Sequence, residues 1–179
     1  MSKDQRFESL YETHYAAVAA YCRRRVAGDA VDDVMADVFV AAWRRVEEIS
    51  EGLELPWLYG AARNVVANQQ RSFGRRSRLA IRASSQRSVS APEPAAAVLA
   101  GDPMVLSALA ALSSSDQEVL RLRAWEELSS AEMAVVLEIS AAAVDMRLSR
   151  AKRRFERALN GAGFTARRAS ARLGTGELS

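Results

Sequence analysis

The stretch ALAALSSSDQEVLRLRAWEELSSAEMAVVLEISAAAVDMRLSRAKRRFERAL (residues 108–159) decides the fold of this chain. Its apolar residues recur at helical spacing in three patches, and a very short turn at Ile139 and Ser140 separates the last two. The final patch begins polar and becomes strongly basic, with six bases against two acids over residues 145–159. This order is typical of a helix-turn-helix whose second helix enters the major groove of DNA. The sequence therefore predicts DNA as the ligand.

Serine hydroxyls precede each predicted helix of this segment, where they can cap free backbone N–H groups. They belong to Ser113–Ser115, to Ser129 or Ser130 with Glu132 in the first turn, and to Ser140 before a helix that starts at Ala141. On that last helix one face is apolar, with Val144, Leu148, Ala151 and Phe155. The opposite face is polar and basic, so it is either a solvated surface or a DNA-reading surface.

The N-terminal part has the same helical periodicity. Helices are predicted over residues 31–43, with Gly28 and Asp29 as the turn before them, and over residues 56–71, with Pro56 in the first turn. Between residues 73 and 103 the pattern ends in a stretch rich in Ser, Arg, Ala and Pro, and residues 71–90 contain six arginines and no acid. We predict an all-α chain with two small helical domains joined by a flexible basic linker, the second domain being a helix-turn-helix. The first domain spans residues 1–72, the linker 73–103 and the second domain 104–160, and a short flexible tail follows at 161–179.

Composition argues against several other classes of protein. Cys22 and His14 are the only residues of their types, so no cysteine zinc site, disulfide or histidine-based catalytic set is predicted, and no cofactor. No apolar run is long enough to cross a bilayer, and the first fifteen residues lack the centre of a secretory signal, so we expect a cytoplasmic protein without membrane insertion. Cys22 is either a redox switch or, as we expect, a small apolar helix residue.

Two sets of residues together resemble the small extracytoplasmic-function (ECF) group of sigma-70 factors. The segment quoted above resembles that group's promoter-binding C-terminal domain. DVMADVFVAAW (residues 33–43) and PWLYGAARNVVANQQR (residues 56–71) resemble its N-terminal domain, in the expected order. The resemblance implies a non-catalytic sigma factor that directs promoter-specific transcription initiation. The implied partners are core RNA polymerase, through the clamp helices of its largest subunit and the flap of its second-largest subunit, promoter DNA, and an anti-sigma factor.

The resemblance also implies roles for matching residues. Polymerase binding falls on the helix at residues 31–43, with Asp32, Asp33, Asp37 and Phe39 as the candidates. Recognition and melting of the −10 element fall on Trp57, Tyr59, Arg63, Asn64, Asn68 and Arg71. Recognition of the −35 element falls on Asp145, Met146, Arg147, Ser149, Arg150, Arg153 and Arg154, with the last two expected on phosphate. Trp57 can equally be a core residue, and the three aspartates can equally form a solvated face.

Several positions depart from the family pattern, among them Ser114, Gln117 and Ala36, where the family often has Pro, Arg and Gln. Two further departures bear on the turn and on promoter reading. Glu138 stands where the turn commonly has glycine, so either the turn has another shape or Glu138 adopts a positive φ at a cost of about 1 kcal/mol. Asp145 replaces a residue that is frequently basic or small, and it can accept from cytosine N4 or merely avoid phosphate.

Two other functions remain open at this point. One is a stand-alone helix-turn-helix regulator, which would bind duplex DNA tightly without polymerase. The other is an enzyme with a DNA-binding tail, against which the absence of a clustered catalytic set in the sequence argues.

Overall fold

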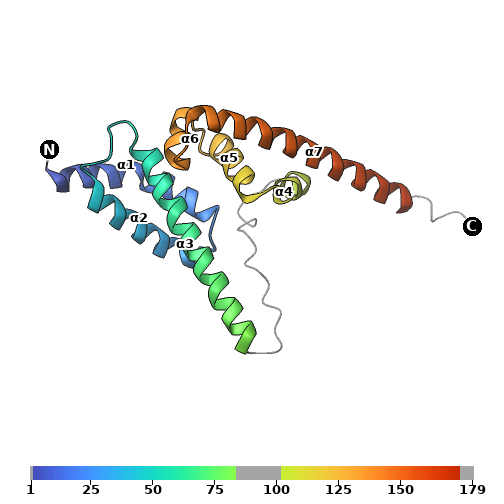
Figure 1. Cartoon of the computed structure of the whole chain (residues 1–179), viewed down its shortest axis with the longest axis horizontal. Coiled ribbons are helices and arrows are strands. Elements are labelled where there is room, and N and C mark those ends of the chain that lie inside the picture. Colours follow the sequence, from blue (N-terminus) through green and yellow to red (C-terminus); the bar gives the residue numbers. More distant parts are fainter. Residues whose placement is uncertain (1, 84–101, 174–179) are drawn as a thin grey trace, which may run out of the picture. The chain divides into compact units, whose positions relative to one another are not determined.

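The computed structural model describes residues 2–83 and 102–173, with side chains described for residues 2–71 and 102–161. Every regular element in these ranges is helical, which confirms the predicted all-α fold (Figure 1). The described residues up to 83 form one compact unit, and most of those from 102 onward form a second. Residues 84–101 of the predicted linker and residues 174–179 of the predicted tail lie outside the described ranges.

The first unit consists of three packed α-helices and a short 3₁₀ helix. These elements are α1 (Lys3–Arg23), the 3₁₀ helix η1 (Gly28–Ala30), α2 (Val31–Arg45) and α3 (Glu54–Ala83). Each α-helix packs against the other two. The core between them is built from fully buried apolar side chains, among them Val18, Val34, Val38, Ala42, Leu58 and Ala62. Burial of such side chains stabilises the fold by roughly 25 cal/mol per Å² of apolar surface.

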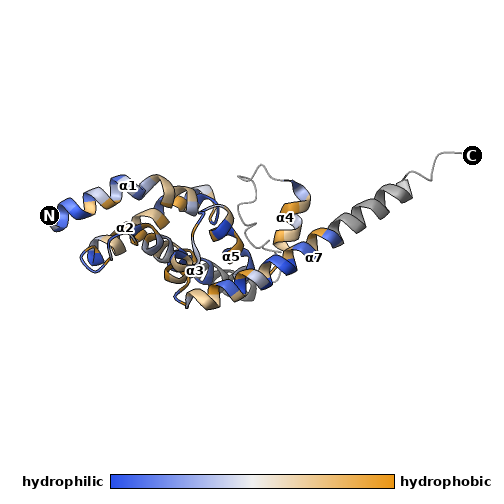
Figure 2. Ribbon diagram, turned by 90° about the horizontal axis from the view of Figure 1, so that it is seen from above, coloured by the Kyte–Doolittle hydropathy of each residue, from blue (hydrophilic) through white to orange (hydrophobic). Residues whose placement is uncertain are grey.

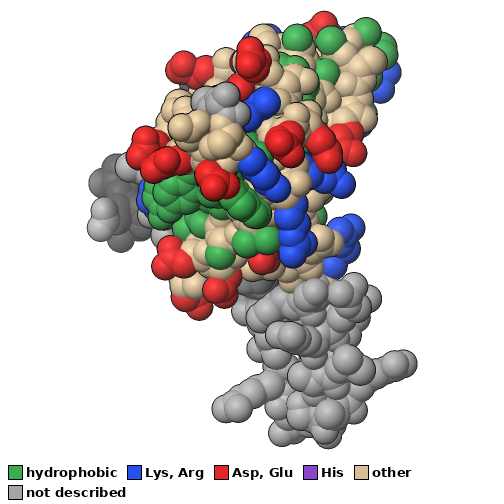
Figure 3. Space-filling model, turned by 90° about the vertical axis from the view of Figure 1, so that its left-hand side faces the viewer, with side chains coloured by type: hydrophobic (Ala, Val, Ile, Leu, Met, Phe, Trp, Pro, Cys, Tyr) green, Lys and Arg blue, Asp and Glu red, His purple; other side chains and the backbone are tan. Residues whose placement is uncertain are grey.

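Aromatic side chains between α1 and α2 extend this core to the protein surface. We call Phe7, Tyr11, Tyr15, Phe39 and Trp43 the aromatic cluster. Its ring centroids lie 4.6 Å apart for Tyr11 and Phe39 and 5.1 Å apart for Phe7 and Trp43. Phe39 is buried, whereas Tyr11, Tyr15 and Trp43 are each 39–40% exposed. Figure 3 shows an apolar patch bordered by acidic side chains, and further apolar side chains at the upper right of the view.

The second unit is organised around its longest helix. It contains α4 (Pro103–Ala110), α5 (Ser114–Ala124), α6 (Ser130–Leu137) and α7 (Ala141–Leu173). α7 packs against both α4 and α5, and α4 is apolar over most of its length (Figure 2). The fully buried side chains here include Val119, Leu122, Met133, Val144 and Ala151.

The helix starts of the second unit are fixed by the side chains that the sequence indicated. Ser113 Oγ accepts from the backbone N–H of Asp116 at 3.2 Å, and Ser140 Oγ accepts from that of Ala143 at 3.2 Å. Ser129, rather than Ser130, caps α6: its hydroxyl accepts from the N–H of Glu132, whose carboxylate accepts from the N–H of Ser129. Hydrogen bonds from Ser129 hold the pKa of Glu132 below its usual value. Each such cap is worth about 1 kcal/mol.

The turn between α6 and α7 has a left-handed residue at Glu138, with φ of 54°. The turn therefore keeps the backbone shape for which glycine is the ordinary choice, and of the two alternatives left open by the sequence the strained one is correct. A second non-glycine residue with φ of 54°, Glu127, lies between α5 and α6.

Two helices extend beyond their predicted ends. α3 continues from Arg71 to Ala83, through the first part of the predicted linker, and α7 continues from Leu159 to Leu173, through most of the predicted tail. Both extensions are rich in Ala and Arg, which rank among the better helix formers, and each only adds residues to an existing helix. The prediction from composition therefore underestimated the length of α3 and α7.

Candidate nucleic-acid interface

The N-terminal half of α7 has two faces that differ in burial and in chemistry. Val144, Leu148 and Ala151 are buried against the rest of the second unit. Among the residues predicted to meet the −35 element, Arg147 is half-buried and the others are exposed: Asp145, Met146, Ser149, Arg150, Arg153 and Arg154. Because the buried and exposed residues alternate with the helical repeat, the exposed set forms a continuous stripe that starts in the first turns of α7.

The first two residues of this stripe have distinct surroundings. The hydroxyl of Ser130, at the start of α6, donates to the carboxylate of Asp145 at 2.5 Å. Met146 is 56% exposed and is the most exposed of the large apolar side chains in the described residues. The stripe thus begins with an oriented hydrogen-bond acceptor beside an exposed thioether.

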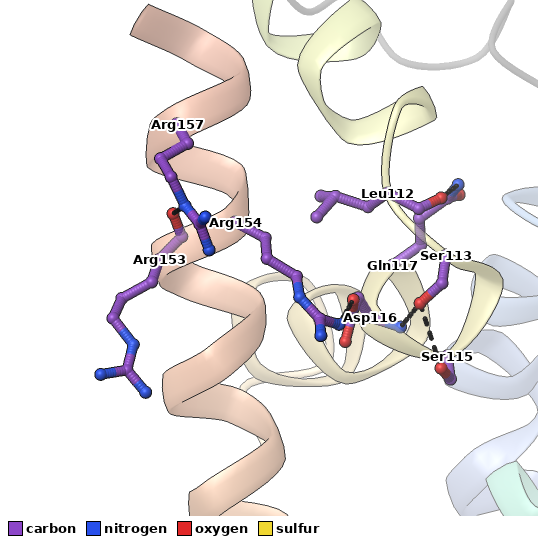
Figure 4. Close-up of polar contacts among 8 residues, drawn as sticks. All are labelled: Leu112, Ser113, Ser115, Asp116, Gln117, Arg153, Arg154 and Arg157. Atoms are coloured by element: carbon purple, nitrogen blue, oxygen red, sulfur yellow. Dashed lines mark hydrogen bonds and ion pairs between the residues drawn. The ribbon is translucent and has the colours of Figure 1, made fainter.

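Two adjacent arginines of α7 differ in their bonds. The guanidinium of Arg154 donates to Asp116 on α5 at 2.6 Å, and the Asp116 side chain is only 5% exposed (Figure 4). Arg153 points away from this pair in Figure 4, and its backbone carbonyl accepts from Arg157. The bond to Asp116 gives Arg154 a second role, which is to hold α7 against α5. The phosphate contacts expected of Arg153 and Arg154 stay predictions.

The predicted −10 residues on α3 fall into three classes of exposure. Asn64, Asn68 and Arg71 are exposed, and Arg71 donates to Asn68 at 2.6 Å. Trp57 and Arg63 are half-buried. Tyr59 is 4% exposed, and its ring stacks on Tyr21 with centroids 4.9 Å apart. The packing of its ring on another ring favours a core role for Tyr59, and a DNA contact by this residue stays a prediction.

The predicted polymerase-binding residues on α2 also separate by face. Asp32, Asp33 and Asp37 are exposed, whereas Phe39 is 6% exposed within the aromatic cluster. This burial favours a supporting role for Phe39 beneath the surface, and its contact with polymerase stays a prediction. On the same helix Trp43 and Val40 are 39% and 49% exposed.

Sequence reasoning did not assign a site role to Asp116, Ser130, Val40 or Trp43. Asp116 precedes its arginine by 38 positions, and Ser130 precedes Asp145 by 15, so no local pattern connects them. The exposure of Val40 and Trp43 had a weak signal, because both fall off the strict apolar face of the predicted helix.

The titratable groups that could suggest other chemistry are Cys22 and His14. Burial raises the pKa of the Cys22 thiol to about 11, against the opposing charges of Arg25 and Arg23. Burial also lowers the pKa of His14, with Glu54 acting in the opposite direction. Within the described residues no three His, Cys, Asp or Glu side chains gather as metal ligands would, and none of the described helices could cross a membrane.

Comparison with known proteins places both units in one family. The family description "Sigma-70 region 2" matches residues 10–76, and "Sigma-70, region 4" matches residues 103–155. A probable RNA polymerase sigma factor RfaY of Xanthomonas campestris pv. campestris is 33% identical over 143 residues, which cover 76% of this chain but 35% of that protein. The ECF RNA polymerase sigma factor SigL of Mycobacterium tuberculosis is 29% identical over 164 residues, covering 88% of this chain and 90% of that one.

A solved structure shares the arrangement of helices. It is CnrH in complex with the cytosolic domain of CnrY, with a TM-score of 0.59 and 27% identity, covering 87% of this chain and 88% of that one. The similarity therefore extends over both units and not over a single motif.

Proposed function

The chain belongs to the sigma-70 family, as a sigma factor of the ECF type, and from this membership we propose how its helices divide the work of promoter-specific transcription initiation. The observation that carries the proposal is the exposed polar stripe at the start of α7, opposite three buried apolar residues. A capped helix that follows a short turn and presents such a stripe suits the major groove of duplex DNA. We assign α7 to the −35 element and, of the pair Arg153 and Arg154, propose Arg153 as the main phosphate contact.

The −10 element is assigned to the exposed side of α3. Asn64 and Asn68 offer amide groups that can bond the edge of an unpaired base, and Arg71 and Arg63 offer charge to the strand. Trp57 is half-buried, so part of its side chain remains accessible, and we assign it to stacking on a base. Tyr59 and Tyr21 support the helix from within the unit.

The polymerase contact is assigned to α2. Asp32, Asp33 and Asp37 give one side of this helix three exposed negative charges, and Trp43 with Val40 adds exposed apolar surface. Such a surface suits a partner that is basic and partly apolar, and opposite charges speed the encounter and fix its orientation. The clamp helices of the largest subunit are the proposed partner, with the flap of the second-largest subunit as the partner of the second unit.

Regulation by an anti-sigma factor is proposed by analogy. The related CnrH is held in a complex with the cytosolic domain of CnrY. We propose that this chain is held in the same way by a partner that competes with polymerase, that it acts in the cytoplasm, and that it has no catalysis of its own.

A gel-shift experiment separates this function from that of a stand-alone regulator. A promoter duplex is incubated with the protein, with core polymerase, and with both. A shift that requires both components supports the sigma-factor assignment, whereas a tight, sequence-specific shift by the protein alone favours the regulator.

The assignment of α2 is tested with a charge reversal and a matched control. Asp33→Arg with Asp37→Arg should weaken retention of core polymerase about tenfold or more, because like charges replace opposite ones. Glu47→Arg with Glu51→Arg changes the net charge equally at exposed positions between α2 and α3, and it should leave retention close to wild type. Equal retention for both variants would remove α2 from the interface.

A further inference from the structure

An exposed methionine on an otherwise polar surface is unusual enough to ask what it contacts. Met146 is 56% exposed, and its neighbours along the exposed stripe are Asp145, Ser149 and Arg150. Leaving an apolar side chain in water gives up the stabilisation that its burial would provide. In the major groove the apolar group that a side chain can cover is the C5 methyl of thymine.

The residue beside it presents a single kind of hydrogen-bonding group in a fixed place. The Asp145 carboxylate accepts from the Ser130 hydroxyl, so its position is set by α6 as well as by α7. An ionised carboxylate only accepts hydrogen bonds, and it is repelled by phosphate. Among base edges it suits the N4 amino group of cytosine, whereas adenine places its N7 acceptor beside its N6 donor.

We propose that Asp145 and Met146 read two neighbouring base pairs of the −35 element, a cytosine through its N4 amino group and a thymine through its methyl group. Consecutive residues of a helix project about 100° apart with a rise of about 1.5 Å, so the two side chains reach adjacent pairs rather than the same one. This proposal rests on the proposed function of α7, and it adds the identity of the bases. Ser130 acts as a positioning residue, because its hydroxyl bonds to Asp145 and so fixes the carboxylate.

The thymine contact is tested by removing one methyl group from the DNA. Holoenzyme selects its preferred −35 element from a randomised promoter library, and each thymine of that element is then replaced singly by deoxyuridine. One replacement should lower promoter binding about three- to fivefold for the wild type, the value expected for one buried methyl. The same replacement should have no effect with Met146→Ala. Met104→Ala, which removes an exposed methionine from α4, should keep the wild-type response.

The cytosine contact is tested by a change of preference. Wild-type holoenzyme should favour cytosine at the neighbouring position by about tenfold. Asp145→Asn should shift the preference to adenine, because an amide both accepts from N6 and donates to N7. Ser130→Ala should reduce the cytosine preference while leaving the deoxyuridine response intact, a separation that a general loss of folding would not produce.

The outcomes distinguish this inference from the function on which it rests. A holoenzyme whose binding is indifferent to every −35 base would overturn both the assignment of α7 and the reading by these two residues. A holoenzyme with a clear −35 preference overturns the inference alone if deoxyuridine has no effect, if its effect persists in Met146→Ala, or if Asp145→Asn retains the cytosine preference.

Discussion

The carboxylate of Asp116 accepts a hydrogen bond from the guanidinium of Arg154 at 2.6 Å and so joins α5 to the helix proposed to read DNA. Burial alone would raise the pKa of Asp116, but the hydrogen bonds from Arg154 and Ser113 outweigh it and hold the pKa below its usual value. Arg154 itself is about half exposed, so the pair is screened by solvent on one side. Its main effect is to fix where α7 lies on α5.

The ion pair predicts how stability depends on pH. Because the pKa of Asp116 is lower in the folded state than its usual value of 3.8, the stabilisation is complete above about pH 5 and is lost as the pH falls through the folded-state pKa. We expect Asp116→Asn to lower the unfolding free energy of the second unit by about 1–2 kcal/mol at pH 7, with the deficit shrinking below about pH 4.

Trp125 fluorescence in a Trp43→Phe, Trp57→Phe background reports urea unfolding of the second unit alone. Glu156→Gln, an exposed acid on α7, serves as the control and should leave stability unchanged. A deficit for Asp116→Asn that stays constant down to pH 2 would contradict the role given to its ionised form.

The neighbouring arginines should separate folding from DNA binding. Arg154→Ala leaves Asp116 without its charged partner and should destabilise the second unit by about 1–3 kcal/mol. Arg153→Ala should keep stability within about 0.5 kcal/mol, yet it should weaken holoenzyme binding on all promoters alike and reduce the salt slope by about one. Urea unfolding and salt titrations of promoter binding measure the two effects. An unchanged salt slope for Arg153→Ala would remove it from the phosphate contacts.

The left-handed turn at Glu138 predicts a stabilising substitution. Glycine adopts a φ of 54° without the Cβ clash. Glu138→Gly should therefore raise the free energy of unfolding by about 0.5–1 kcal/mol, even after the larger entropy of glycine in the unfolded chain is included. Glu138→Ala removes the same charge but keeps the Cβ, and it should not stabilise. Differential scanning calorimetry of the two variants decides the matter. A gain that appears equally in both would point to the charge and not to the backbone.

The thiol of Cys22 should not react with alkylating reagents in the folded protein. Its side chain is fully buried, and with a pKa of about 11 almost none of it is thiolate near neutral pH. We expect native protein to resist iodoacetamide for hours and unfolded protein in urea to react within minutes, as followed by intact mass. Modification of native protein at the unfolded rate would restore the redox-switch hypothesis.

Melting of the −10 element should depend on the exposed amides of α3. Asn64→Ala should leave the closed complex nearly intact while it lowers the open complex, because an amide that bonds an unpaired base acts only after the strands separate. Permanganate reactivity of −10 thymines measures opening. Gln70→Ala changes another exposed amide on the same helix and is the control. Equal thymine reactivity in Asn64→Ala and wild type would count against the assignment.

Helix starts were predictable from the sequence because their determinants are local. Ser113 and Ser140 cap the helices they precede. For the turn at Glu138 the sequence left two shapes open, and the structure has the one with positive φ. Helix ends were less predictable, since α3 and α7 extend into stretches that composition marks as linker and tail. Ala and Arg continue a helix already nucleated by packed residues, even where they offer little to bury.

Individual side-chain roles were the least predictable part. Phe39 and Tyr59 carry the residue types of a binding surface, yet each packs against a ring on another helix. Arg154 is indistinguishable from Arg153 in the sequence, and only the fold brings Asp116 to one of them. Such assignments depend on contacts between residues distant in the chain, which periodicity does not report.

The buried face and the exposed face of α7 share no residue, so evolution can change one face while it keeps the other. Val144, Leu148 and Ala151 maintain the fold, whereas Asp145, Met146, Ser149 and Arg150 point outward. Under the role proposed for α7, substitutions in the outward set redirect the protein to other promoters while the buried set maintains the fold. A one-residue insertion within this helix would instead rotate everything beyond it by about 100° and bury the wrong face. Divergence in this helix is therefore expected to proceed by replacement and not by changes of length.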